Sequence, residues 1–480
     1  MYRIKAVQTP SLMEALLLTI TIIVVISSSI IFFGAAPHVP LVISLLLLCI
    51  YGLVKKVPYK TLEEGIIEGA KSGMGAVFIF FFIGILIASW MLGGTIPTLI
   101  YAGFELVTPS FYFAIIFVCT ALVGMVVGSS LTTVATVGVA FIGISGAVDV
   151  SLAITAGAIV SGAFFGDKMS PISDTTNMAS AILKVDLFEH IRNMMWTTIP
   201  AFVITFIIFA VISPTLTDSN FGNMEVFKEG LLATDLVHWY NGAIPLAVLL
   251  VLSILKVPAI LTIAAGSVSA IALSFINGIQ SLKQLFGVLM GGFVSETGVE
   301  KIDSLLTRGG IDSMLFTIGL VLLALSMGGL LFTLGIIPRL LASIEHLLKK
   351  ISSVITASAL TAIGINVLIG EQYLSILLTG ETYRSQYSKV GLANKNLSRV
   401  AEDAGTVINP LVPWSVCGVF IASVLGVPTL EYLPFAFFCL LSPLLTVFFG
   451  YTGWTLTHVP SDQTVTNKSQ HTEVQTTGTE

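Results

Sequence analysis

A run of polar residues interrupts the longest apolar stretch of this chain. Residues 166–177 read Gly-Asp-Lys-Met-Ser-Pro-Ile-Ser-Asp-Thr-Thr-Asn. Residues 111–165 before the run carry one charged side chain, Asp149, and residues 199–212 after it are again apolar. A charged side chain at the centre of a membrane costs about 2.5–3.5 kcal/mol. The run therefore predicts a helix broken near Pro171 at membrane depth, with polar groups that serve an ion or substrate site.

The composition indicates a membrane protein built from helices. Of the 480 residues, 55% are hydrophobic and only 10% are charged, whereas soluble domains carry roughly 25% charged residues. The mean hydropathy is +0.97. The apolar runs are about 15–25 residues long, the length of spanning helices, and they lack the alternating pattern of membrane β-barrels. The predicted fold class is an all-α polytopic membrane protein.

The candidate spans have approximate limits only. Two or three of them are expected to be re-entrant hairpins or halves of broken helices, which gives about 11–13 transmembrane segments. The candidates are 14–33, 38–54, 73–92, 111–127, 132–148, 150–166, 195–213, 242–256, 258–276, 311–335, 352–370, 404–425 and 431–450.

The charged residues predict the orientation of the chain. Lysine and arginine lie near the N-terminus and again in residues 55–71, while the loop at 34–40 between the first two spans has neither. Because cytoplasmic loops are enriched in these residues, the N-terminus is predicted to be cytoplasmic. Residues 59–70 resemble an amphipathic interfacial helix. The net charge of −5 and the absence of a basic stripe argue against a nucleic-acid partner.

An internal repeat is the second informative feature. A gapless alignment of Asp167 with Asp403 places Ser170 opposite Thr406 and Ser173 opposite Asn409. Each run follows an earlier polar interruption, and this order predicts two inverted-topology repeats. The predicted division is 1–72 (N-terminal helices and interfacial segment), 73–213 (first repeat), 214–310 (external loop and connecting helices), 311–455 (second repeat) and 456–480 (disordered polar tail).

Asp167 and Asp174 are the first candidates for an ion or proton site. A carboxylate in a low-dielectric environment can hold a proton near neutral pH, and a bare cation competes for the same oxygens. Neighbouring side chains can complete the shell of a hard cation; they are Ser170, Ser173, Thr175, Thr176 and Asn177. The alternative is that residues 167–168 mark a cytoplasmic loop, with Asp174 as a helix N-cap.

Glu402 and Asp403, with Thr406 and Asn409, form the candidate partner site. The alternative is an exposed loop after Arg399. Glu371 and Glu381 flank a nine-residue spacer that is too short to span, so a hairpin tip or re-entrant segment is predicted there. A further set of hydroxyls and amides could bind an anion, or could bond to their own helix carbonyls; it comprises Gly128, Ser129, Ser130, Thr132 and Thr133.

The run at 166–177 resembles the signature of the NhaC family of Na⁺/H⁺ antiporters, which includes malate-2H⁺/Na⁺-lactate antiporters. The stretches at 128–138 and 402–414 also resemble that family, in the same order, and the resemblance covers residues 10–455. It implies Na⁺/H⁺ exchange by alternating access in a bacterial inner membrane, with lipid as the surroundings, no cofactor, and Na⁺ and H⁺ as the transported ions. Assembly as a homodimer stays open. Leu131 stands where the family pattern leads us to expect tryptophan, which leaves the substrate branch open.

Two alternative functions are weighed against this one. An exchanger of small carboxylates such as malate and lactate could use residues 128–133 and Lys168 as its anion site. An intramembrane aspartyl protease would need Asp167 and Asp403 on facing helices sharing one proton. The second alternative is disfavoured, because the internal repeat has no role in that chemistry.

Overall fold

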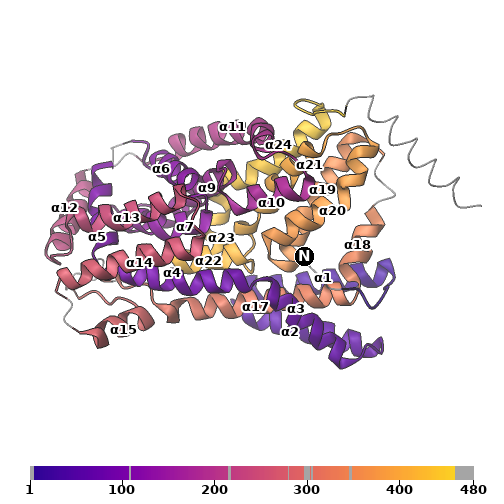
Figure 1. Ribbon diagram of the computed structural model, residues 1–480, viewed down its shortest axis with the longest axis horizontal. Helices are drawn as coiled ribbons and strands as arrows, with labels where there is room; N and C mark the ends of the chain where they lie inside the picture. Colours follow the sequence, from indigo (N-terminus) through magenta and orange to yellow (C-terminus); the bar gives the residue numbers. More distant parts are fainter. Residues whose placement is uncertain are drawn as a thin grey trace, which may run out of the picture.

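The computed structural model describes residues 5–106, 110–214, 218–278, 281–296, 303, 306–344 and 349–459. These residues form helices, and no β-strand occurs among them (Figure 1). The α-helices are α1 Leu12–Ile31, α2 His38–Val54, α3 Tyr59–Ser72, α4 Met74–Leu92, α5 Thr95–Gly103, α6 Tyr112–Val127, α7 Ser130–Thr133, α8 Val139–Ala147, α9 Leu152–Met169, α10 Asp174–Leu183, α11 Leu187–Ile212, α12 Asp218–Leu232, α13 Trp239–Ile254, α14 Ala259–Ile276, α15 Leu282–Gly291, α17 Ile311–Thr333, α18 Ile336–Ile344, α19 Ile351–Ile369, α20 Gln372–Lys389, α21 Asn394–Val400, α22 Val416–Leu425, α23 Thr429–Tyr432 and α24 Phe437–Thr452.

Five short segments depart from α-helical geometry. Two are π-helices, η2 Val134–Gly138 and η4 Ala401–Thr406. Three are 3₁₀-helices, η1 Phe104–Leu106, η5 Asn409–Leu411 and η6 Leu433–Phe435. π-Helices are rare and appear mostly as single turns at functional sites. Both π-helices of this chain lie in the segments that the sequence marks as polar interruptions.

The all-α polytopic class is confirmed. Eight of the described helices are long and apolar enough to cross a membrane, or up to ten if each bent pair forms one span. The predicted 11–13 segments exceed this number because three predicted spans, 38–54, 111–127 and 242–256, form helices of 17, 16 and 16 residues. The predicted polar tail at 456–480 falls mostly outside the described residues.

A hairpin tip or re-entrant segment was predicted around residues 371–381. The chain turns at Gly370 between α19 and α20, which pack against each other, and the nine-residue spacer lies within the 18-residue helix α20. Gly380 faces Ile182 and Leu183 of α10. The turn therefore lies at the start of the predicted spacer, and Glu381 lies within a continuous helix.

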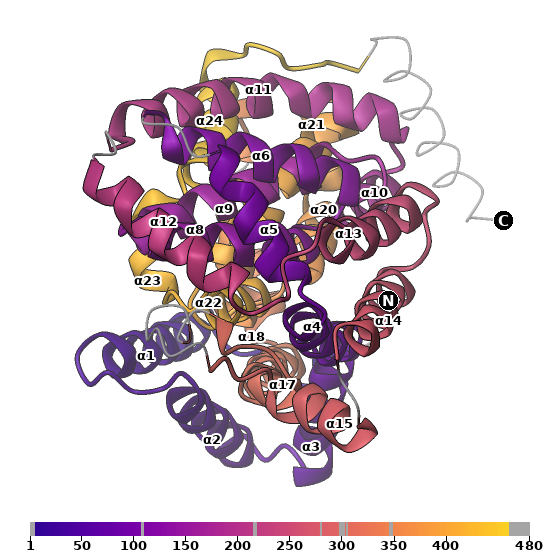
Figure 2. The same ribbon diagram turned by 90° about the vertical axis from the view of Figure 1, so that its left-hand side faces the viewer.

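The amphipathic segment predicted at 59–70 is the helix α3, and it packs closely along α17. Gly69 of α3 lies directly against Gly329 of α17, and Gly65 lies against Thr333. Glycines permit this approach because a side chain at either position would collide with the facing helix. Figure 2 shows α1, α2, α3, α15 and α17 gathered on one side, away from α6, α9, α11 and α24.

The order of helices in the first half recurs in the second half. The helix α9, Leu152–Met169, corresponds to the segment Asn394–Leu411, a constant shift of 242 residues (152 to 394, 169 to 411). The same shift relates α10 to α22, at 174–183 and 416–425. The predicted alignment of Asp167 with Asp403 was therefore wrong by six residues, and these bounds place Asp167 opposite Asn409.

The turns between these helices also correspond. Gly128 and Gly370 both adopt the left-handed conformation, with φ of 68° and 76°, which glycine adopts without a steric penalty. The next residues, Ser129 and Glu371, both cap the following helix with their side chains. The inverted orientation of the two halves in the membrane stays a prediction.

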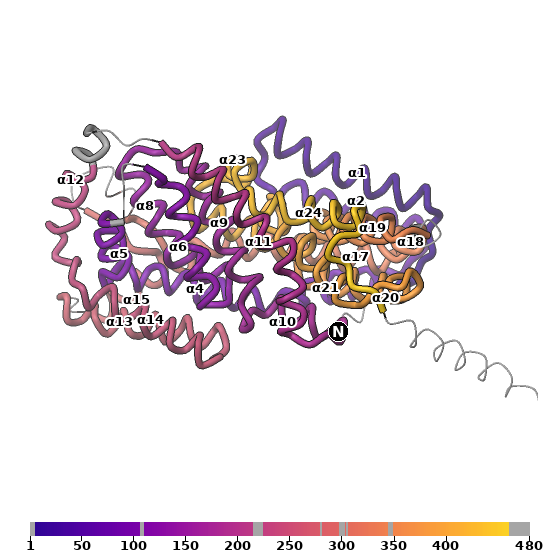
Figure 3. The backbone as a smooth tube through the Cα atoms, turned by 90° about the horizontal axis from the view of Figure 1, so that it is seen from above, coloured from indigo at the N-terminus to yellow at the C-terminus, as the bar shows by residue number. Residues whose placement is uncertain are grey.

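The helix after the break in each predicted repeat contacts helices of the other repeat. The helix α10 of the first half packs on α20 and α21 of the second, and α22 of the second half packs on α7, η2 and α8 of the first. Figure 3 shows α5, α6, α8 and α9 toward one end of the long axis and α18, α19 and α20 toward the other. The breaks before α10 and α22 consequently lie where the halves meet.

Candidate functional site

Asp167 lies buried in the last turn of α9, directly before the break. Its Oδ2 accepts a hydrogen bond of 2.8 Å from the Ser130 hydroxyl. The Ser173 hydroxyl and the Ser130 backbone N–H also bond to this carboxylate. Ser130 opens α7, immediately after the turn at Gly128. The structure thus brings the two polar interruptions of the first half together around one carboxylate.

Lys168 forms an ion pair with Asp403, and both side chains are 0% exposed. The Thr446 hydroxyl donates to the other oxygen of Asp403, and the Lys168 ammonium lies 5.8 Å from the centre of the Phe438 ring. Residues 167–168 are therefore not a cytoplasmic loop. Asp403 is paired with Lys168, so it does not form a proton-sharing dyad with Asp167, which removes the basis for a protease.

Asp174 is the first residue of α10, and Ser173 is the N-cap that the alternative assigned to Asp174. The Asp174 side chain is exposed and lines a cavity of about 200 Å³. Asn177, Ser129 and Lys256 line the same cavity, which lies between the two breaks of the first half and the turn from α13 to α14. Asp167 and Asp174 therefore occupy different places, one buried in the protein and one at a cavity wall.

The other polar side chains of the run brace the break itself. Their bonds replace those that the interrupted helix lacks. Ser170 Oγ accepts from Ile172 N (3.4 Å), Thr175 Oγ1 bonds with Ser173 Oγ (3.1 Å), Thr176 Oγ1 donates to Lys168 O (3.2 Å), and Asn177 Nδ2 donates to Pro171 O (3.0 Å) and Ser173 O (2.7 Å).

Both interpretations of residues 128–133 apply to part of the segment. Thr133 Oγ1 donates to Ser129 O at 2.8 Å, within its own helix. Thr132 Oγ1 donates to Ser129 Oγ at 3.0 Å. Ser130 instead reaches across to Asp167. The hydroxyl that serves the deep site is therefore that of Ser130, while Ser129 faces the cavity.

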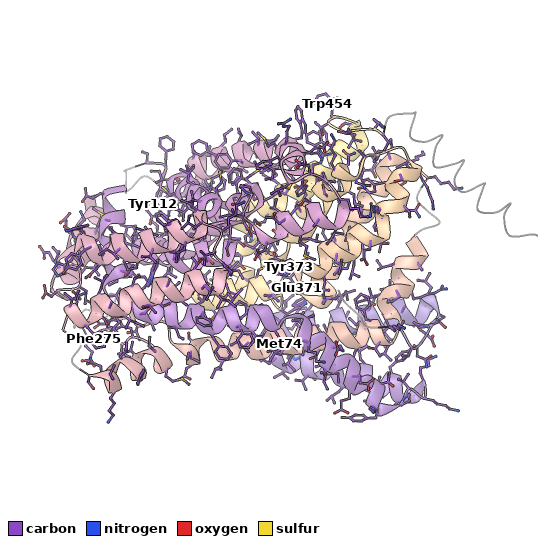
Figure 4. The ribbon with its side chains drawn as sticks, viewed as in Figure 1. Met74, Tyr112, Phe275, Glu371, Tyr373 and Trp454 are labelled. Carbon is purple, nitrogen blue, oxygen red and sulfur yellow. The ribbon has the colours of Figure 1, made fainter. Side chains whose placement is uncertain are left out.

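Glu371 is buried and caps α20, with Oε2 accepting from Leu374 N at 2.7 Å. Figure 4 shows Glu371 and Tyr373 together in the middle of the molecule. The Tyr373 side chain interacts electrostatically with Asp167, Asp174 and Glu371. Glu381, by contrast, is exposed on α20. The structure therefore brings Glu371 toward Asp167 and leaves Glu381 outside the site.

Glu402 lies in the π-helix η4 with a side chain that is 0% exposed. Apart from a contact with the Thr406 hydroxyl, neither of its carboxylate oxygens has a hydrogen-bond partner among the described residues. It interacts electrostatically with Asp167, Lys168 and Asp403. The alternative of an exposed loop after Arg399 is wrong, because every residue from Asn396 to Val412 is buried.

Asn409 joins the second break to α19 rather than facing open space. Its Nδ2 donates to Asn366 Oδ1 at 2.8 Å, and its Oδ1 accepts from Cys417 N at 2.9 Å. Asn366 also donates to Gly405 O at 2.6 Å. Asn366 was not among the predicted site residues, although an asparagine inside the apolar span 352–370 indicates a buried polar contact.

These features define a class of protein: a polytopic secondary transporter whose buried carboxylates lie at helix breaks. The sequence model of the Na⁺/H⁺ antiporter family matches residues 4–174 and 162–454. The chain therefore belongs to the Na⁺/H⁺ antiporter family, whose members are transporters rather than enzymes, and the resemblance found in the sequence is confirmed.

Three relatives show the range of the family. The Na⁺/H⁺ antiporter NhaC of Alkalihalophilus pseudofirmus is 43% identical over 90% of this chain and 93% of its own length. The arginine/ornithine antiporter ArcD of Halobacterium salinarum is 37% identical over 82% of each chain. The malate-2H⁺/Na⁺-lactate antiporter of Bacillus subtilis is 32% identical over 94% of this chain and 96% of its own.

Proposed function

We propose that this protein exchanges Na⁺ for H⁺ across the bacterial inner membrane by alternating access, with its N-terminus in the cytoplasm. One observation carries the proposal. Asp167, Glu371 and Glu402 are buried carboxylates that form no ion pair with a basic residue in the described part of the chain, since the neighbouring Lys168 is paired with Asp403. The similarity to the antiporter NhaC over 90% of the chain supports the same activity.

The charge of this site explains how one protein can exchange the two ions. A buried carboxylate is costly unless its charge is compensated, and either a proton or a Na⁺ compensates it. Because the two compete for the same oxygens, loading one displaces the other. If the protein changes its open side only with the site loaded, transport of Na⁺ in one direction drives H⁺ in the other.

An organic anion is the second candidate, because one of the relatives is a malate-2H⁺/Na⁺-lactate antiporter. A carboxylate substrate requires a cation or free N–H groups facing it. Lys168 is buried against Asp403, so the basic residue placed to meet a substrate is Lys256, at the wall of the cavity. The buried carboxylates Asp167, Glu371 and Glu402 favour a cation as substrate. An organic anion would instead have to bind in the cavity beside Lys256.

The test uses proteoliposomes containing a pH-sensitive dye. Proton movement on addition of NaCl, but not of KCl or choline chloride, is the expected result. The apparent KM for Na⁺ should rise as the pH falls, because protons occupy the same carboxylates. Movement only with malate and lactate on opposite sides, or with arginine and ornithine, would replace the proposal with organic-ion exchange.

A further inference from the structure

The π-helix η4 carries buried oxygen atoms that the packing leaves without partners. Both carboxylate oxygens of Glu402 and the hydroxyl oxygen of Thr406 are buried, and apart from the contact between these two side chains none has a hydrogen-bond partner among the described residues. The two side chains lie next to each other in space, four residues apart on the same wide turn. Leaving such groups unpaired costs about 1–3 kcal/mol each, and more for a charged group.

The facing helix α20 adds further unpartnered oxygens. The oxygen Oγ1 of Thr379 and the amide oxygen of Gln372 are also buried without a partner in the described part of the chain. These two residues lie seven positions apart and so share one face of α20. Ile376, between them on that face, packs against Ala401 at the start of η4. Ala401 and Gly405 of η4 contact α20, and Glu402 and Thr406 each follow one of them in the chain.

The backbone of η4 is unusual where it contacts α20. Ser375 Oγ lies 3.1 Å from the position that a Cβ would take at Gly405, so a side chain there would press on Ser375 of α20. The corresponding residues of the first half, 159–164, are ordinary α-helix within α9. The π-turn η4 thus has no counterpart at the matching position of the first half, and π-turns are frequent at functional sites.

We propose that Glu402, Thr406, Thr379 and Gln372 form a dehydrated binding site for one Na⁺, distinct from the hydrogen-bonded carboxylate of Asp167. The site offers oxygen ligands only, which suit a hard cation. A single carboxylate matches a monovalent charge, whereas Ca²⁺ takes six to eight oxygens from several carboxylates. This inference rests on the proposed exchange of Na⁺ and names the group that binds the ion directly.

The two carboxylates differ in what surrounds them. Asp167 accepts bonds from Ser130 and Ser173, so donors already occupy its oxygens. Glu402 has only the Thr406 hydroxyl beside it among the described residues, and the nearby charges of Asp167 and Asp403 repel an anion while that of Lys168 is compensated by Asp403. A cation is therefore attracted to Glu402 rather than to Asp167.

The experiment measures ²²Na⁺ binding to the purified full-length protein in detergent, at constant ionic strength maintained with choline chloride. Glu402→Gln should weaken Na⁺ binding by at least about tenfold, and Thr406→Val, which keeps the shape of the side chain, by about three- to tenfold. The matched control Glu381→Gln, an exposed glutamate on α20, should bind as the wild type does.

Wild-type binding by both Glu402→Gln and Thr406→Val would overturn the site. If Glu402→Gln fails to fold, Thr406→Val and Thr379→Val decide the result. Binding in detergent does not require proton coupling. If the variants lose Na⁺ binding but the wild-type protein shows no Na⁺/H⁺ exchange in liposomes, the site stands and the proposed function is rejected. If the wild-type protein exchanges Na⁺ for H⁺ but the variants bind Na⁺ normally, the site alone is rejected.

Discussion

At the scale of single residues, the contrast between paired and unpaired charges organises this protein. Lys168 and Asp403 neutralise each other inside the protein, with Thr446 and Phe438 completing their surroundings. Glu402, one residue before Asp403, has no such partner. Adjacent carboxylates therefore have different surroundings: Asp403 is paired with Lys168, and Glu402 is the one that we propose as an ion ligand.

The ion pair leads to a stability prediction. Lys168→Met or Asp403→Asn alone should destabilise the protein by about 3–5 kcal/mol, because each leaves one buried charge unpaired. The double variant Lys168→Met/Asp403→Leu should recover most of that loss. Thermal unfolding of the purified protein in detergent measures this. Equal losses in the double and single variants would show that the pair is not the source of the effect.

The cavity leads to a kinetic prediction. Asp174 is exposed at the cavity wall and away from the buried cluster. Asp174→Asn should therefore raise the apparent KM for Na⁺ a few-fold, roughly the effect of an exposed charge, and leave the maximal rate nearly unchanged. Dye-based exchange assays over a range of Na⁺ concentrations give both values. Complete loss of exchange in a folded Asp174→Asn protein would instead place this carboxylate in the ion site.

At the scale of helices, close packing depends on where glycine is placed. The helix α3 meets α17 through Gly65 and Gly69, and α9 meets α6 through Gly162 and Gly166, where an added Cβ would reach the facing backbone. Small residues of this kind let helices associate in lipid, where no hydrophobic driving force draws them together. The close contacts of α3 with α17 and of α6 with α9 therefore depend on glycines, which have no side chain.

Gly69 tests this argument. Its Cβ position lies 2.9 Å from the Cα of Gly329, so Gly69→Ala should destabilise the protein by about 1–3 kcal/mol by forcing α3 and α17 apart. Gly364→Ala is the matched control, since nothing lies within 4 Å of its Cβ position, and it should be neutral or stabilising by up to about 1 kcal/mol. Unfolding midpoints in detergent compare the two. Equal effects would mean that helix propensity, not contact, dominates.

At the scale of the whole molecule, the two predicted repeats contact each other near their helix breaks. The helix α10 packs on α20 and α21, and α22 packs on α7, η2 and α8. The cavity formed by the turn at Gly128, the break at 171–177 and the α13–α14 turn opens beside Lys256. The acidic helix α12, by contrast, lies at one end of the long axis (Figure 1). The predicted orientation places the cavity on the cytoplasmic side and α12 outside.

Cysteine labelling tests this orientation. Asn177→Cys, in a background with the four native cysteines replaced, should react with a membrane-impermeant maleimide in inside-out vesicles and be protected in right-side-out ones, because Asn177 lines the cavity. The control Glu225→Cys, exposed on α12, should show the opposite pattern. Labelling of both from the same side would contradict the predicted topology.

Much of this organisation is local and was therefore legible in the sequence. Apolar length sets where helices span, and Pro171 with its polar neighbours predicted the break that follows Met169. The turns at Gly128 and Gly370, where glycine adopts a left-handed conformation, lie where the two earlier polar interruptions of the sequence begin. The resemblance in residues 166–177 indicated the family that the comparison with known proteins confirmed.

Other features required the tertiary structure because they depend on residues far apart in the chain. Asp403 finds Lys168 across 235 positions, and Asn366 finds Asn409 across 43. Sequence alone treated Asp403 as an ion ligand and overlooked Asn366, since neither partner is visible from a local pattern. Burial without a partner, as at Glu402, is a property of packing, because it exists only once every neighbouring helix is in place.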